Sequence, residues 1–488
     1  MKKLRFIAAL CAATMALSVT AFAEEPPAET EVPDETVAAE ETTAPEEDAP
    51  AEEETDDAPA MRDITTMELV KDMGLGINLG NTFESCGSWI NGDSVTNFET
   101  AWGSIEITED IIKGIADAGF GVLRIPVAWS NMMDEDYTIA PEYIDRVKEV
   151  VDWTVDSGMY AIVNIHWDGG WWDGFATDEK DECMKKYTRI WEQLSEAFGE
   201  YNDYVMFESL NEEGAWDSIW NRYGGSRAKK PDAYALLNEI NQKFVDIVRA
   251  SGGNNAERHL LIAGYGTDAT LTCDELFEVP NDPMNRCAVS IHYYTPSTFC
   301  ILEKDASWGK AQTEWGSQSD IDELNKYMTM IKERFIDNGI PVIMGEYGVA
   351  AKSNKTKEMI NYFNGVTCKA MVDVGICPVL WDTYDRNNPT GCYYNRGTLQ
   401  MNDPELQQIF ADILAGTYEP DMPETEAPET DAPATEAPET DAPETDAPET
   451  EAPADTTNPD TGSNGIAVTA GVAVIAAAAV LVTKKIKK

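Results

Sequence analysis

Eight short apolar runs, most of them followed by a longer amphipathic stretch, constrain the fold of this chain more than any other feature. Continuous runs of aliphatic and aromatic residues are typical of strands that are buried on both faces, as in parallel sheets. This β-then-α order, repeated eight times, predicts an α/β fold, the (β/α)8 TIM barrel. The runs occupy residues 74–80, 121–127, 160–167, 204–212, 260–266, 287–294, 340–348 and 376–382.

The helical signals between the runs agree with this order. Thr108 is expected to cap the helix formed by ITEDIIKGIADAG, and Gly158 and Gly339 are each expected to end a long helix. The weakest helical segment follows the fifth run, where only LTCDELFEV is available. One helix of the barrel is therefore expected to be poorly formed.

Composition divides the rest of the chain into further segments. Residues 1–23 have a basic start, an apolar stretch and the small-x-small sequence AFA, the pattern of a secretory signal peptide. Residues 24–61 and 418–457 are acidic and rich in Pro, Ala and Thr, and the second of them repeats PETDA-type pentads. Such segments bury too little apolar surface to fold, so both are expected to be disordered linkers. The barrel domain is then expected to span residues 62–417.

The last segment, residues 458–488, combines NPDTG, an apolar run of 18 residues and the basic sequence KKIKK. It resembles the signal that sortases cleave between Thr and Gly, which here would follow Thr461, although Asn458 stands where Leu is usual. Attachment to the cell wall by a sortase is one interpretation. Retention in the membrane is the other, because 18 apolar residues are near the lower limit for spanning a bilayer. Both place a secreted barrel at the cell surface.

The charge of the barrel segment limits its partners. The chain has a formal net charge of −52, and residues 62–417 alone hold 57 acids against 29 bases. Nucleic acids and anionic lipids need a basic face, so neither is an expected partner, whereas a neutral polysaccharide suits the domain. The catalytic domain is expected to be monomeric. Its eight cysteines permit disulfides without specifying a pairing, and some are expected to be free and buried.

Polar side chains gather at the carboxyl ends of the predicted strands, where (β/α)8 barrels carry their active sites. Glu212 and Glu346 end the fourth and seventh runs, and two facing carboxylates are the apparatus of retaining glycoside hydrolysis. Glu208 shares the strand parity of Glu212 but lies deeper, so it is expected to form a structural ion pair. Glu213 is expected to be solvated in the following loop; the alternative is that it shares the role of Glu212.

These motifs resemble those of glycoside hydrolase family 5, the family of many cellulases. The stretches GINLGNTFE, LRIPVAW, NIHWDGGWW, ESLNEEG, IHYYTP, IMGEYG and LWD occur in the family order and cover nearly all of residues 62–417. The resemblance implies that Glu212 is the acid/base and Glu346 the nucleophile. It also implies substrate-binding roles for Arg124, His166, Asn211, His292, Tyr294 and Trp381. No cofactor is expected, and no metal site, because the rim histidines lie on separate strands without HExxH-type spacing.

The chain departs from the family pattern at two positions. Glu213 replaces the proline of the usual Asn-Glu-Pro, and a like charge at this position would raise the pKa of Glu212, which suits a proton donor. Trp167 replaces the second of two adjacent histidines. Seven tryptophans near rim loops are candidates for stacking on sugar rings, with core packing as the alternative for each: Trp89, Trp129, Trp167, Trp171, Trp172, Trp216 and Trp381. Of these, Trp171 and Trp172 are expected in an exposed loop.

The leading interpretation is a surface-anchored endo-β-1,4-glucanase that hydrolyses cellulose or a related glucan with retention. A second interpretation keeps this mechanism but changes the polymer to xyloglucan, mannan, xylan or mixed-linkage glucan. A third is an inactive barrel that serves as a carbohydrate adhesin. The presence of both carboxylates argues against the adhesin.

Overall fold

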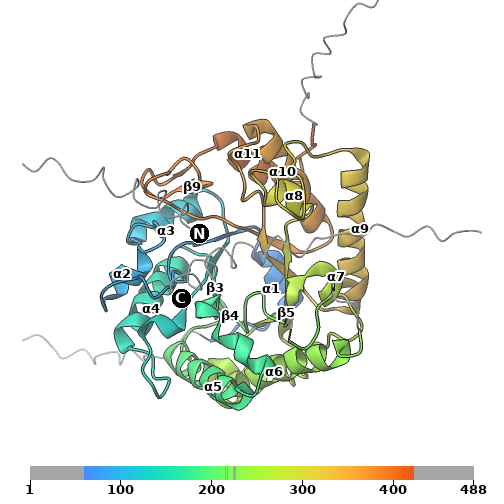
Figure 1. Cartoon of the computed structure of the whole chain (residues 1–488). Helices are drawn as coiled ribbons and strands as arrows, with labels where there is room; N and C mark the ends of the chain where they lie inside the picture. Colours follow the sequence, from blue (N-terminus) through green and yellow to red (C-terminus); the bar gives the residue numbers. More distant parts are fainter. Residues whose placement is uncertain (1–59, 215, 217, 224–226, 422–488) are drawn as a thin grey trace, which may run out of the picture. The chain divides into compact units, whose positions relative to one another are not determined.

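The computed structural model describes residues 60–214, 216, 218–223 and 227–421. Its centre is a closed barrel of eight parallel strands in sequence order, which confirms the predicted (β/α)8 fold. Figure 1 looks into the ring of helices that surrounds these strands. The strands are β1 (Gly76–Asn78), β2 (Val122–Ile125), β3 (Tyr160–Asn164), β4 (Val205–Glu208), β5 (Leu260–Asp268), β6 (Cys287–Tyr293), β7 (Val342–Tyr347) and β8 (Cys377–Leu380).

Helices connect the strands around the outside of the barrel. The helix after β5, α7, has only 4 residues, as the weak pattern there predicts. A small antiparallel pair, β9 (Tyr394–Asn395) and β10 (Gln400–Met401), follows β8. The helices are α1 (Thr66–Asp72), α2 (Val95–Glu99), α3 (Glu109–Asp117), α4 (Pro141–Asp156), α5 (Lys180–Ala197), α6 (Lys230–Ala250), α7 (Ala269–Thr272), α8 (Ser297–Cys300), α9 (Gln318–Arg334), α10 (Lys357–Asp373) and α11 (Pro404–Leu414).

Two helix ends differ from the sequence prediction. Thr108 stands at the N-cap position of α3, but its side chain makes no capping hydrogen bond. The long helix expected to end at Gly339 stops at Arg334, and a short 3-10 turn, η4 (Ile336–Asn338), fills the interval. Gly339 still ends this unit, with a left-handed φ of 77°. Gly158 ends α4 in the same way, with φ 79°, as predicted.

One apolar cluster lies between the barrel and its helices. Leu123 of β2, Val163 of β3 and Phe207 of β4 belong to it and are buried. A second cluster fills the N-terminal half of the barrel interior, because neighbouring residues of a strand point to opposite faces. Leu69 and Val70 of α1, with Met73 at its C-cap position, join this second cluster and close the N-terminal end of the barrel.

The barrel interior changes from apolar to polar along the strands. Val122, Ile162, Met206 and Ala288 contribute to the interior apolar cluster from β2, β3, β4 and β6. The residues two positions farther along face the same interior, and all of them are polar and fully buried: Arg124, Asn164, Glu208 and Ser290. This polar layer forms the floor on which the candidate site is built.

Several sequence predictions fall outside the described residues. These are the signal peptide, most of both acidic linkers, and the C-terminal segment that contains Thr461. Within the described part of the chain, no helix is both long enough and apolar enough to cross a membrane. The eight cysteines of the barrel are all free; six are buried, and Cys86 and Cys273 are partly exposed.

Candidate active site

Arg124 is the centre of the hydrogen-bond network at the mouth of the barrel. Its Nε donates to Glu208 Oε2 at 2.7 Å, and its Nη1 donates to Glu346 Oε1 at 3.0 Å. Nη1 also donates to Asn78 at 2.9 Å, and Nη2 donates to Asn211 at 2.8 Å. A guanidinium presents its donors in a rigid planar fork, so Arg124 fixes residues of β1, β7 and the end of β4 relative to one another.

Glu346, near the end of β7, has the neighbours that an ionised carboxylate needs. Oε1 accepts from Arg124, and Oε2 accepts from the hydroxyl of Tyr294 at 2.9 Å. Burial raises the pKa of Glu346, while the nearby His292, Arg124 and the Tyr294 hydroxyl act in the opposite direction. Of the two candidate catalytic carboxylates, Glu346 therefore has the surroundings that better stabilise a negative charge.

An irregularity in β7 turns Glu346 toward the interior. The register between β6 and β7 shifts after Met344, and His292 pairs with Glu346 beyond the shift. Gly345 lies against the interior residues Ser290 and His292, and Glu346 immediately after it also points inward to Arg124. Regular alternation would send one of these two neighbours outward, so the shift re-aims the carboxylate into the site.

Glu212, just beyond β4, has a different environment. Its side chain is 24% exposed, and Oε1 lies 2.9 Å from His292 Nδ1. The pKa of Glu212 is raised to about 7, first by burial and then by the charge of Glu208, with Arg124 opposing. No cation bonds to it directly in the described residues, so it retains a proton near neutral pH more readily than Glu346 does.

His292 lies between the two candidate catalytic carboxylates. Its Nδ1 is 2.9 Å from Glu212 and 3.6 Å from Glu346. Burial lowers the pKa of His292 to about 4, so the ring is neutral at neutral pH. One donor atom from each of the three residues lies within 4.8 Å of the others, which is close enough to hold a metal ion. The guanidinium of Arg124 already supplies a positive charge to Glu346, so the geometry accounts for the carboxylate without an ion.

His166 and Trp381 form a stacked pair at the ends of β3 and β8. Their ring centroids are 5.8 Å apart and the planes differ by 6°. Burial, with Arg124 and His292 nearby, lowers the pKa of His166 well below its ordinary value, so it too is neutral. Trp381 is half-buried. All eight residues that the resemblance selects therefore lie at the carboxyl ends of the strands, and Arg124, Asn211, His292, Tyr294 and the two glutamates form one bonded network.

The prediction for Glu213 is wrong, and the prediction for Glu208 is confirmed. Glu213 is 1% exposed rather than solvated, and its carboxylate accepts the backbone N–H of Asn211 at 2.6 Å. The loop turns the side chain inward because that buried N–H needs an acceptor. The main cause of the raised pKa of Glu212 is burial, and the neighbouring acid that adds to it is Glu208, not Glu213. Glu208 is fully buried and ion-paired with Arg124 at 2.7 Å, as expected.

The rim tryptophans divide into three groups. Trp129 and Trp216 are buried core residues. Trp171 and Trp172 were expected in an exposed loop, but both are half-buried and pack against the core. Trp381 is also half-buried and packs against the core. Trp89 is 56% exposed. Trp167 packs edge-on against Trp172 with ring centroids 5.4 Å apart, so the loop after β3 presents a paired aromatic surface.

Sequence reasoning missed three buried residues of the network: Asn78, Asn164 and Ser290. Asn78 bonds to Arg124, and Asn164 and Ser290 both donate to Glu208, at 3.0 and 2.7 Å. Each is a single small polar residue within an apolar run. The signal that could have found Asn164 and Ser290 is parity, because each lies two residues beyond an apolar residue that faces the interior, Ile162 or Ala288.

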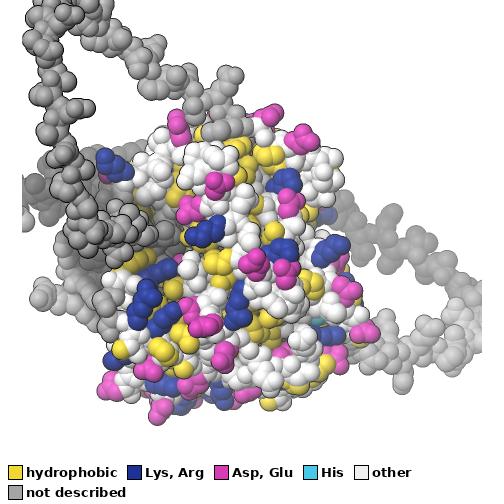
Figure 2. Space-filling view, turned by 90° about the vertical axis from the view of Figure 1, so that its right-hand side faces the viewer, with side chains coloured by type: hydrophobic (Ala, Val, Ile, Leu, Met, Phe, Trp, Pro, Cys, Tyr) yellow, Lys and Arg dark blue, Asp and Glu magenta, His cyan; other side chains and the backbone are white. Residues whose placement is uncertain are grey.

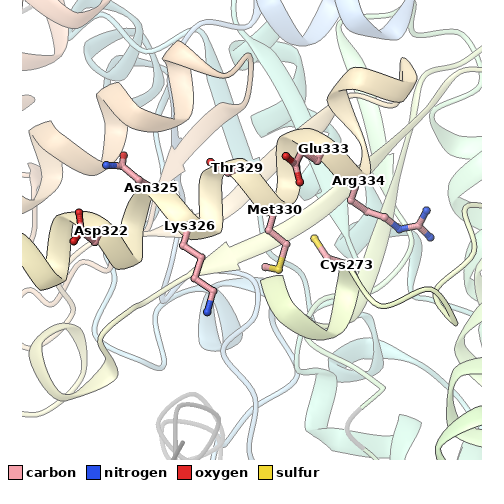
Figure 3. A pocket seen from close by; sticks show the side chains of 8 residues that line it. All are labelled: Cys273, Asp322, Asn325, Lys326, Thr329, Met330, Glu333 and Arg334. Atoms are coloured by element: carbon pink, nitrogen blue, oxygen red, sulfur yellow. The ribbon is translucent and has the colours of Figure 1, made fainter. Parts of the chain in front are cut away.

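A surface hollow of about 640 Å³ lies elsewhere on the molecule. Figure 3 shows its lining on α9, where Lys326, Met330 and Arg334 project beside Cys273. None of the candidate site residues lines it. This hollow is therefore separate from the carboxylate pair.

The barrel, with two facing carboxylates at the carboxyl ends of β4 and β7, defines a glycoside hydrolase. The chain belongs to glycoside hydrolase family 5, since the model of the family named Cellulase (glycosyl hydrolase family 5) matches residues 84–387.

Proteins of known activity and solved structures resemble the chain over most of the barrel. Endoglucanase A of Paenibacillus barcinonensis is 34% identical over 388 residues, which cover 74% of this chain and 92% of that protein. A xyloglucan-specific endo-β-1,4-glucanase of Bacteroides ovatus is 33% identical over 345 residues, 67% of this chain and 66% of that protein. The structure of a broad-specificity endoglucanase from an uncultured bovine rumen ciliate is 35% identical, with a TM-score of 0.65, and covers 72% of this chain and 99% of its own.

Proposed function

We propose that this glycoside hydrolase is an endo-β-1,4-glucanase that cleaves internal bonds of cellulose or related plant cell-wall β-glucans with retention of configuration. The observation that carries the mechanism is that a carboxylate oxygen of Glu212 lies within 4.8 Å of a carboxylate oxygen of Glu346. Retaining enzymes hold their carboxyl groups about 5–5.5 Å apart, whereas inverting enzymes need about 6.5–9.5 Å to admit a water molecule between them. The short separation favours direct attack by one carboxylate.

In the first step, Glu346 attacks the anomeric carbon and Glu212 donates its proton to the leaving glycosidic oxygen. The bond from the anomeric carbon to that oxygen breaks, and an ester to Glu346 forms. The assignment follows from the neighbours: Glu346 accepts from Arg124 and Tyr294, while the pKa of Glu212 is raised to about 7. The ionised group is the nucleophile and the protonated group is the acid.

In the second step, Glu212, now ionised, takes a proton from a water molecule that attacks the same carbon. The ester bond to Glu346 breaks, the hemiacetal product leaves, and both carboxyl groups return to their starting states. Neutral His292, 2.9 Å from Glu212, can hydrogen-bond to it in either protonation state because the ring offers a donor or an acceptor. His166 and Trp381 supply an apolar stacked surface beside the reacting sugar.

The substrate class is supported by the relatives and by the surface charge. Their names include endoglucanases, a xyloglucan-specific enzyme and a lichenase, all of which act on β-glucans. Residues 62–417 hold 57 acids against 29 bases, a balance that does not favour a polyanion, and Figure 2 shows acidic and basic side chains interspersed over the face that includes α9. A neutral glucan remains the best match.

A substrate panel tests the proposal. The purified protein is assayed for new reducing ends on a soluble cellulose derivative, xyloglucan, lichenan, mannan and xylan, beside Glu212→Gln and Glu346→Gln. We expect a β-1,4-linked glucan to be the best substrate and each variant to lose about 100-fold or more of the rate. Glu213→Gln is the matched control and should keep its activity. Preference for mannan or xylan would overturn the proposed substrate class, and binding of a polysaccharide without cleavage would favour the adhesin interpretation.

We also propose that the protein is secreted and held at the cell surface by its C-terminal segment. The proposal rests on the leader-like residues 1–23 and on the NPDTG motif with its apolar and basic continuation. If a sortase cleaves after Thr461, Thr461→Ala should prevent covalent attachment to the cell wall. A muralytic enzyme should then release the wild-type protein from the wall fraction but not the variant. An unchanged distribution would favour membrane retention through the apolar run instead.

A further inference from the structure

Beneath the two candidate catalytic carboxylates lies a third, Glu208, which contacts neither of them directly in the described residues. It is fully buried at the end of β4. Its Oε2 accepts from Arg124 Nε at 2.7 Å and from Asn164 at 3.0 Å, and its Oε1 accepts from Ser290 at 2.7 Å. Donors from β2, β3 and β6 therefore hold both oxygens, and the carboxylate has no freedom to rotate.

The position of Glu208 determines the orientation of Arg124. Glu208 occupies the Nε of the guanidinium, while the two Nη atoms reach Glu346 and Asn211. Because the guanidinium is planar, fixing Nε fixes the direction of both Nη atoms. Asn211 directly precedes Glu212, so one planar group places the nucleophile and the strand end that carries the acid.

We propose that Glu208 is a positioning residue for glycoside cleavage, which holds Arg124 in the orientation that serves Glu346 and balances its charge so that Glu212 keeps its proton. This inference rests on the proposed function of the site. A buried ion pair is weak evidence for stability, because removing two charges from water offsets much of their attraction. The placement of Arg124 explains why a carboxylate occupies this buried position.

The charges around Glu208 give the inference a measurable sign. The charged and titratable groups around it are Arg124 from β2, Glu212 and Glu213 beyond the end of β4, and the neutral His292 from β6. The charge of Glu208 raises the pKa of Glu212, and that of Arg124 lowers the pKa of both catalytic carboxyls. With Glu208 neutral, the charge of Arg124 would act unbalanced, and both pKa values would fall.

The test compares Glu208→Gln with Glu213→Gln in the full chain. Both residues are buried glutamates of the same segment, but Glu213 bonds to backbone and has no contact with Arg124 in the described residues. The readouts are kcat, KM, the pH profile of kcat/KM on a soluble cellulose derivative, and the thermal midpoint. For Glu208→Gln we expect kcat to fall about 10- to 100-fold with KM little changed, equivalent to one charge-assisted hydrogen bond.

We expect both limbs of the Glu208→Gln profile to move to lower pH by on the order of one unit, and those of Glu213→Gln to stay in place. Unmoved limbs with a rate loss that follows the thermal midpoint would overturn the inference in favour of a purely structural role, as would an unchanged kcat.

If Glu208→Gln does not fold, Ser290→Ala carries the test, because it removes one hydrogen bond and no charge. It should lower kcat several-fold with the limbs in place, and an unchanged kcat would overturn the positioning role. Failure of the wild type to cleave any β-glucan would count against the proposed function instead.

Discussion

At the scale of single residues, the two catalytic candidates differ in their neighbours more than in their own chemistry. Glu346 accepts from a guanidinium and a phenol, whereas Glu212 has a neutral imidazole beside it. The same side chain thus suits two different roles, because Arg124 and Tyr294 bond to Glu346 and not to Glu212.

The pH dependence of activity follows from this asymmetry. The pKa of Glu212 is raised to about 7, and the first step needs its proton, so kcat/KM should fall as pH rises through about 7, approaching tenfold per unit. A pH profile on a soluble glucan measures this limb. With an activated aryl glycoside, whose leaving group needs no acid, Glu212→Gln should lose the limb. A wild-type rate that stays level to pH 9 would contradict the assignment.

Gly345, one residue before the nucleophile, has no room for a side chain. An added Cβ would lie 2.9 Å from Ser290 Oγ and 3.0 Å from His292 Nε2. Gly345→Ala should therefore displace His292 and Glu346, lowering kcat about tenfold or more and unfolding stability by about 1–3 kcal/mol. Kinetics and denaturant unfolding on the same sample measure both. A variant with wild-type kcat would show that Ser290 and His292 can shift to accommodate the added methyl group without displacing Glu346.

Single residues also show where sequence reasoning succeeds. The residues of the strand ends were predictable because a barrel brings carboxyl ends of strands together, whatever their distance in sequence. Asn78 and Ser290 were missed, because a single small polar residue in an apolar run becomes informative only when the inward and outward faces of the strand have been assigned. Glu213 was predicted wrongly because hydrophobic periodicity does not report a backbone N–H that needs an acceptor, here that of Asn211.

At the scale of elements, the loop after β3 is a rigid part of the rim. Asp168 is buried and accepts from the backbone and hydroxyl of Ser130, both at 2.8 Å, and from Trp171 Nε1 at 2.7 Å. Trp172 Nε1 donates to the carbonyl of Trp167 at 3.1 Å. Gly170 has φ 75°, which turns the chain sharply between the two indoles. The pair Trp167–Trp172 is thus held in place before any ligand arrives.

A preformed indole surface next to His166 should contribute to binding of long glucans. Trp167→Ala is expected to lower kcat/KM on cellohexaose about tenfold, since aromatic surface on a sugar ring is lost. Trp153→Ala is the matched control, because Trp153 is half-buried on α4 beside Arg146, away from the strand ends. Initial rates on oligosaccharides of increasing length measure the effect. Equal rates for both variants would contradict a binding role for the loop.

Element existence was more predictable than element ends. All eight strands coincide with apolar runs, because a strand covered on both faces must be apolar throughout. The end of α9 at Arg334 was not predictable, because the 3-10 turn that follows carries the same helical pattern as the helix. Side-chain capping at Thr108 also failed, since a capping residue type does not fix its own rotamer.

At the scale of the whole molecule, stability comes from the closed barrel and its two apolar clusters rather than from covalent links. All eight cysteines of the described chain are free. The thermal midpoint of the purified protein should therefore change by no more than about 1 °C when a reducing agent is added. Losing a native disulfide costs about 2–5 kcal/mol, so a clear drop in the midpoint would contradict free thiols.

The closure of the barrel by α1 has a consequence for how a polymer reaches the candidate site. Leu69, Val70 and Met73 pack into the apolar interior, so the barrel is closed at its N-terminal end. Nothing can therefore approach Glu212 and Glu346 through the barrel from below. A glucan reaches them only across the opposite face, where the strands have their carboxyl ends, and both products must leave by that same face.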